Sequence, residues 1–72
     1  MKWNKRNNWG PGYLGQGYES GEYIIEETTN YYELAKENGG KQKDYWWVLR
    51  KNEEPIKYAS TAKALKQYAE DL

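Results

Sequence analysis

The apolar positions of the chain are densest in residues 45–49, Tyr-Trp-Trp-Val-Leu, which follow two glycines and precede a polar segment at residues 52–55. Aromatic and β-branched residues favour a pleated, half-buried surface, so this run predicts a central β-strand. Strand alternation divides its residues between two faces, with Tyr45, Trp47 and Leu49 on one and Trp46, Val48 and Arg50 on the other. Both faces therefore carry large apolar groups, and which of them covers the core becomes the main question for function.

Three other segments have the pattern of strands. Residues 22–28 alternate between turn-forming neighbours, with Tyr23 and Ile25 on one face. Residues 56–58 form a short apolar and aromatic run after the turn at residues 52–55, and Pro55 favours a strand start or a sheet edge. A further short strand is expected near residues 13–18, inside a Gly-rich N-terminal stretch that is otherwise typical of turns.

The C-terminal segment, residues 61–72, predicts an amphipathic helix with Ser60 as its cap. Its apolar residues recur at helical spacing: Ala64, Leu65, Tyr68, Ala69 and Leu72. Residues 30–39 remain open between two interpretations. Asn30 with Glu33 matches a capping box and Gly39 fits a helix C-terminus, but Tyr31-Tyr32 favours a hairpin strand.

These elements predict an α+β fold, in which a small antiparallel sheet of three to four strands carries the C-terminal helix on one face. The whole chain, residues 1–72, is expected to form a single small domain, with residues 1–12 as a partly ordered arm. We expect the helix to cover the face that holds Trp47 and Leu49. Trp46 and Arg50 are then exposed on the other face.

Composition excludes several classes of function. The chain has no Cys and no His, so it lacks thiolate metal ligands, the commonest metal ligand and the commonest general base. The glycines at positions 10, 12, 15 and 17 match neither a phosphate loop nor a dinucleotide fingerprint. We therefore expect a protein that is not an enzyme and that uses neither a metal nor a cofactor.

The formal net charge is zero, but the charges are segregated along the chain. Residues 19–37 hold six Glu against one Lys, whereas residues 1–18 and 38–51 are basic. Such segregation can produce a bipolar surface, whereas general nucleic-acid binders are usually basic overall. No apolar run approaches membrane-spanning length and the N-terminus is polar, so we expect a cytoplasmic protein without a membrane partner.

Residues 47–53 and 56–70 combine a Trp-bearing strand, a polar turn, a short strand and a Thr-led helix with Ala-Lys and Tyr-Ala pairs. This combination resembles short proteins encoded by phages and prophages, some of which block host defences by binding. It is also similar to the three-stranded DNA-binding domains of AP2-type factors and phage integrase arms. Those domains carry basic and polar residues along the sheet, whereas residues 22–28 here are acidic.

The first functional hypothesis is a protein-binding module, in the form of a phage-encoded inhibitor or accessory protein that occupies the surface of a host or phage protein. Its candidate contact residues are Trp46 and Arg50 on the open sheet face, and Glu26 and Glu27 on the acidic strand. Trp and Arg are enriched at binding hot spots, and acidic strands complement basic partners. A homodimer that hides one sheet face also fits this pattern.

The alternative hypothesis is a nucleic-acid-binding module that uses the N-terminal arm together with the sheet aromatics. Its candidate residues are Trp3, Lys5, Arg6 and Trp9, because aromatic rings stack on bases while Lys and Arg hold phosphates.

Overall fold

The computed structural model describes residues 1–6 and 17–72. Within these ranges the chain forms eight elements: β1 (Asn4–Arg6), β2 (Gly17–Ser20), β3 (Tyr23–Glu27), α1 (Tyr31–Asn38), the 3₁₀ helix η1 (Gln42–Tyr45), β4 (Trp47–Lys51), β5 (Glu54–Ala59) and α2 (Ala62–Glu70). The strands make one antiparallel sheet in the order β1-β2-β3-β4-β5. The α+β class is therefore confirmed, but the described residues form five strands where the sequence predicted three to four.

The difference in strand number comes from the N-terminus. Residues 4–6, which the sequence placed in an arm, pair antiparallel with β2, and Lys5 lies opposite Tyr18. Strands of three residues carry too little local signal to be predicted, and β1 forms because the edge of β2 offers it partners. The expected strand near residues 13–18 is seen as β2, which begins at Gly17, and positions 13–16 lie outside the described residues.

The β2–β3 and β4–β5 connections are turns that contain residues with positive φ angles. Gly21 has a φ of +59° between β2 and β3, where a residue without a Cβ adopts the left-handed conformation at little cost. Asn52 and Glu53 have φ angles of +52° and +73° between β4 and β5, as in the tight turns that suit the twist of a hairpin. The sequence predicted a turn at residues 52–55, but the turn is confined to Asn52 and Glu53, and Glu54 and Pro55 already pair with β4 as the start of β5.

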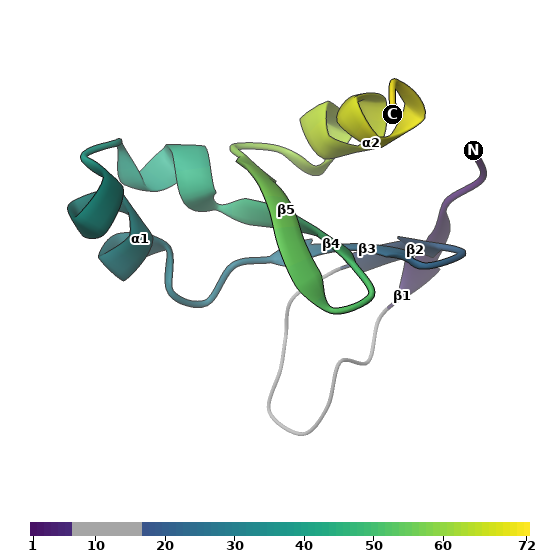
Figure 1. Ribbon diagram of the computed structural model, residues 1–72, viewed down its shortest axis with the longest axis horizontal. Coiled ribbons are helices and arrows are strands. Elements are labelled where there is room, and N and C mark those ends of the chain that lie inside the picture. The colour runs from purple at the N-terminus through teal and green to yellow at the C-terminus, as the bar shows by residue number, and fades with distance from the viewer. Residues whose placement is uncertain (7–16) are drawn as a thin grey trace.

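Helix α2 covers one face of the sheet (Figure 1). Ile25 and Leu49 from the sheet meet Leu65 and Ala69 from the helix, and each of the four is almost fully buried. Thr61, rather than the expected Ser60, caps α2, and its Oγ1 accepts the Ala64 N–H at 3.2 Å.

Helix α2 begins at Ala62, and its buried stripe is narrower than the expected one. Ala62 packs against the core. Ala64, Tyr68 and Leu72 are exposed, although the sequence assigned them to the apolar stripe.

The opposite face of the sheet is also covered at its centre. Val48 is 1% exposed although it belongs to the face away from α2. It lies opposite Glu26 on β3 and Tyr58 on β5. The expectation of a bare second face is therefore wrong at this position.

Residues 31–38 are helical, which resolves the alternatives that the sequence left open. Gly39 ends α1 in the left-handed conformation with a φ of +76°, as expected, and its N–H donates to the Ala35 carbonyl at 2.8 Å. The capping box is not formed, because the Asn30 side chain makes no capping hydrogen bond within the described part of the chain. Helix α1 packs on η1 and projects beyond the end of the sheet (Figure 1).

Candidate functional site

The candidate site lies where the chain leaves the sheet for α1 and returns through η1. Strand β3 ends at Glu27, and β4 begins at its partner Trp47. One residue beyond this pair, the Thr28 N–H donates to the Trp46 carbonyl at 2.8 Å. This hydrogen bond continues the ladder past the strands, so Thr28 and Trp46 are held at a fixed separation before the two segments diverge.

Trp46 does not occupy the strand position that alternation assigned to it. It follows η1 with helical dihedral angles, φ −67° and ψ −30°, and its N–H donates to the Lys43 carbonyl at 3.3 Å. The tight turn rotates its side chain out of the strand pattern, so Trp46 does not share a sheet face with Val48 and Arg50. The side chain is 48% exposed, which agrees with the expectation of an accessible Trp but places it at the end of the sheet.

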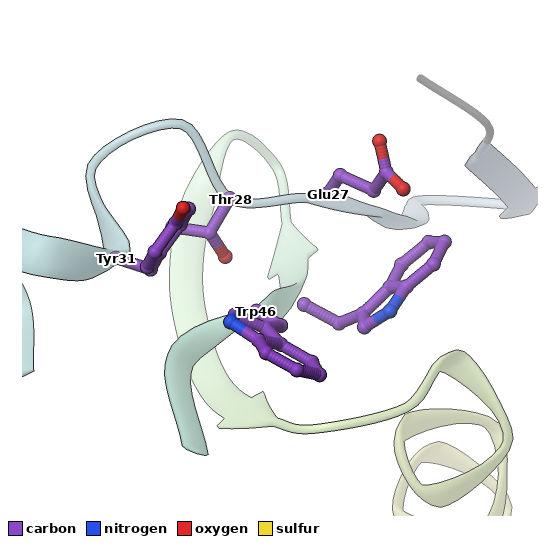
Figure 2. A pocket seen from close by; sticks show the side chains of 5 residues that line it. Glu27, Thr28, Tyr31 and Trp46 are labelled. Carbon is purple, nitrogen blue, oxygen red and sulfur yellow. The ribbon is translucent and has the colours of Figure 1, made fainter. Parts of the chain in front are cut away.

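A pocket of about 260 Å³, called here the end pocket, opens beside this Trp. Its described lining residues are Glu27, Thr28, Tyr31, Trp46 and Trp47. Figure 2 shows the Thr28 hydroxyl directed toward Trp46 with the Tyr31 ring beside it, while Glu27 extends away from Tyr31. Three of the five described lining residues are therefore aromatic, and the other two are Glu27 and Thr28.

The Thr28 hydroxyl is the unusual group in the end pocket. Thr28 is 9% exposed, and within the described part of the chain its Oγ1 is buried without a hydrogen-bond partner. A buried polar atom without a partner costs free energy, so such groups are rare in folded proteins and call for a physical reason. Sequence reasoning missed this residue, because Thr28-Thr29 fits an ordinary strand end and carries no sign of its burial.

The four residues proposed for partner binding separate into two places. Trp46 and Glu27 come together in the end pocket. Glu26 and Arg50 instead bind each other across β3 and β4, with the Arg50 Nε donating to Glu26 Oε1 at 2.8 Å. Arg50 Nη1 also donates to the Glu53 carbonyl at 3.2 Å, which ties the sheet to the β4–β5 turn.

The residues proposed for nucleic-acid binding are also separated. Trp3 is partly buried and packs against the core. Lys5 and Arg6 belong to β1, where Lys5 is exposed. Trp9 lies outside the described residues.

A scan of protein-family models, a search of curated proteins and a search of solved structures each found no match for this chain. In the described ranges, no helix is long and apolar enough to cross a membrane. The case for function therefore rests on the geometry of the end pocket and the aromatic residues around it.

Proposed function

We propose that this chain is a non-enzymatic protein-binding module that contacts its partner through the end of the sheet where α1 and η1 lie. We call this region the aromatic end surface and define it by Tyr31, Tyr32 and Trp46 together with the end pocket. The observation that carries the proposal is the 48% exposure of Trp46 beside a pocket that is also lined by Thr28, whose buried hydroxyl has no hydrogen-bond partner among the described residues.

The composition of the aromatic end surface supports this proposal. Tyr31 and Tyr32 are 36% and 60% exposed on the first turn of α1, and Tyr31 lines the end pocket together with Trp46. Tyr and Trp are enriched at binding hot spots, because they bury a large area on association and lose little side-chain entropy. Exposed aromatic side chains that gather around a concave feature are typical of an interface.

The contacts that hold the residues of the aromatic end surface in place also favour a binding function. The ladder hydrogen bond between Thr28 and Trp46 fixes one wall of the end pocket to the sheet. Tyr45, the residue before Trp46, is also held in place, because its ring packs on Tyr58 with centroids 5.5 Å apart and lies close against Gly40. A preorganised surface loses less conformational entropy on binding than a mobile loop does.

More specifically, we propose that the chain is a phage-encoded inhibitor or accessory protein. A module of this size would act by covering a surface of a host or phage protein, with Trp46 buried at the centre of the contact. Truncation of a central interface Trp typically costs about 2 kcal/mol or more of binding free energy.

The test is an affinity capture from bacterial lysate with the wild-type chain, Trp46→Ala and Tyr68→Ala, each with and without nuclease. Tyr68 is the matched control, because it is a 37% exposed aromatic residue on α2, away from the aromatic end surface. We expect a protein that the wild type and Tyr68→Ala capture after nuclease treatment and that Trp46→Ala does not capture. Capture that nuclease abolishes would favour the nucleic-acid alternative, and equal capture by all three chains would contradict the proposed surface.

A further inference from the structure

We propose that the end pocket is an aromatic cage for a quaternary ammonium group, which the partner protein carries as a trimethylated lysine side chain. This inference rests on the proposed protein-binding function and names the chemical group recognised at the centre of the contact. Three features of the pocket support it: its aromatic lining, the accessible faces of its rings and the burial of its polar atoms.

The aromatic lining comes from three different positions in the fold. Tyr31 is the first residue of α1, Trp46 follows η1 and Trp47 is the first residue of β4. Consecutive residues of a strand point to opposite faces, so Trp46 and Trp47 line one pocket because the 3₁₀ turn takes Trp46 out of the strand pattern. The resulting space of about 260 Å³ is suited to the end of one side chain. Proteins recognise quaternary ammonium groups by surrounding them with aromatic rings in this way.

The rings of Tyr31 and Trp46 have faces that are accessible to a ligand. Figure 2 shows both rings beside Thr28, and the two side chains are 36% and 48% exposed. Elsewhere in the chain lysines lie over tyrosine rings, most closely Lys66, whose Nζ is 3.6 Å from the centre of the Tyr18 ring. In the described part of the chain, no lysine or arginine lies over Tyr31 or Trp46, and neither ring stacks on another ring. A cation supplied by a ligand can therefore use these faces, and indole attracts a cation most strongly.

The polar atoms of the pocket favour a cation that has no hydrogen-bond donors. The Thr28 hydroxyl oxygen is buried from solvent, and Glu27 already has an interaction within the chain. A lysine ammonium or an arginine guanidinium would therefore leave water without gaining these acceptors, and its N–H groups would lose hydrogen bonds. A trimethylammonium group carries a positive charge but no N–H, so it keeps the attraction of the ring faces without this loss.

The start of α1 beside the pocket is compatible with a positive ligand. The N-terminus of a helix carries a partial positive charge, whose effect falls off within the first turn. Glu33 lies in that first turn, so its carboxylate offsets the positive end of the helix.

The test measures the binding of two matched pairs of probes to the full wild-type chain, followed by NMR at the indole N–H signals of Trp46 and Trp47. Choline is compared with its neutral carbon analogue, in which a tert-butyl group replaces the trimethylammonium group. N-acetyl-trimethyllysine methylamide is compared with its unmethylated counterpart. We expect a Kd of about 1 mM for the trimethyllysine probe. The neutral analogue and the unmethylated lysine should each bind at least about fivefold more weakly than the trimethylammonium probe of the same pair.

Two variants assign the selectivity to the ring faces. Trp46→Leu and Tyr31→Leu each keep an apolar side chain and remove a ring, so each should weaken the trimethyllysine probe about fivefold and reduce its advantage over unmethylated lysine. Tyr68→Leu is the matched control, because Tyr68 is a 37% exposed tyrosine on α2, away from the aromatic end surface, and should leave binding unchanged. Far-UV circular dichroism checks the fold of each variant. If Trp46→Leu unfolds, Trp46→Phe takes its place and should bind the probe severalfold more weakly, because its ring attracts a cation less than indole does.

Lipid vesicles distinguish a protein partner from a membrane, because the choline headgroup of a lipid carries the same trimethylammonium group. We expect the chain to bind the trimethyllysine probe and not to sediment with phosphatidylcholine vesicles. Sedimentation with these vesicles, together with no binding of the trimethyllysine probe, would assign the pocket to a membrane surface and overturn the assignment to a partner protein.

The cage itself is overturned if the neutral analogue binds as tightly as choline, or if unmethylated lysine binds as tightly as trimethyllysine. Such a result leaves the proposed function standing as long as Trp46→Ala still loses its captured partner. If the Trp46 capture experiment fails while the preference for trimethyllysine holds, the pocket is selective but is not the centre of a protein interface.

Discussion

The core beneath α2 and the aromatic end surface both contain aromatic residues, but they differ in how completely their side chains are buried. Beneath α2, Ile25, Leu49 and Leu65 are completely buried. At the end of the sheet, Trp46 is half exposed and Thr28 buries a hydroxyl that has no partner in the described part of the chain.

This comparison shows that apolar content alone does not distinguish a region that stabilises the fold from a region that is available for binding. Both regions are rich in aromatic residues, but the region beneath α2 is closed by a nine-residue helix whose cap is satisfied. The end of the sheet is bordered by α1, which packs on η1 and leaves its own tyrosines exposed. Binding sites commonly retain such local departures from ideal packing, at some cost in stability.

The largest expected effect is on the core. Leu65→Ala should lower the free energy of unfolding by about 2–5 kcal/mol, because it removes a fully buried side chain and leaves a cavity beneath α2. Urea denaturation of the full chain measures this loss. Tyr68→Ala serves as the control on the same helix, and a loss equal to that of Leu65→Ala would contradict the observed buried stripe.

A smaller effect is expected for the ion pair on the opposite face. Arg50→Met should lower the free energy of unfolding by about 1 kcal/mol, because it leaves the partly buried Glu26 carboxylate without this donor. A double-mutant cycle with Glu26→Gln separates the pairwise term from the effect of each side chain alone. The coupling should fall as salt is added, and a coupling of zero would show that the 2.8 Å contact contributes nothing to stability.

Thr28→Val should change stability in the opposite direction. The variant removes a buried hydroxyl that has no partner among the described residues and keeps the shape of the side chain, so it should raise the free energy of unfolding by about 1 kcal/mol. Thermal melting with Thr29→Val as the control tests this expectation, because Thr29 is an exposed neighbour of the same chemistry. A destabilised Thr28→Val would indicate that the hydroxyl makes a hydrogen bond that supports the fold.

The smallest effect on stability is expected for Trp46→Ala. Because about half of this side chain is already exposed, the loss should be about 1 kcal/mol or less, well below that of Leu65→Ala. Far-UV circular dichroism during melting measures it. If Trp46→Ala unfolds the chain, the Trp belongs to the core and the aromatic end surface is not a separate binding region.

Much of the architecture could be predicted because it depends on local patterns. Alternation placed Trp47 and Leu49 on the face that α2 covers, and helical spacing identified Leu65 and Ala69 as its buried residues. The left-handed residue after α1 was predictable as well, because Gly39 adopts that conformation without a steric penalty. Each of these features is set by a few neighbouring residues.

The candidate site could be predicted only in part. The sequence predicted an accessible Trp46, which the structure confirms, but it paired Trp46 with Arg50 on one sheet face and Glu26 with Glu27 on the acidic strand. The structure instead brings Trp46 together with Glu27, and Arg50 together with Glu26. A 3₁₀ turn stabilised by neighbours from other elements rotates Trp46 out of the strand pattern, and no periodicity in residues 45–49 signals it. The prediction failed because a two-residue alternation assumes that the strand has already begun.

What the sequence by itself determined was the order of most elements, the class of fold and the face that meets α2, since these follow from periodicity and turn chemistry. The tertiary structure alone decided that residues 4–6 add a strand, that Val48 is buried on the second face and that the Thr28 hydroxyl is buried away from solvent. The physical reason is that burial depends on which segments meet. The meeting of Thr28, Tyr31 and Trp46 requires strand pairing between residues about twenty positions apart, together with the packing of α1 on η1.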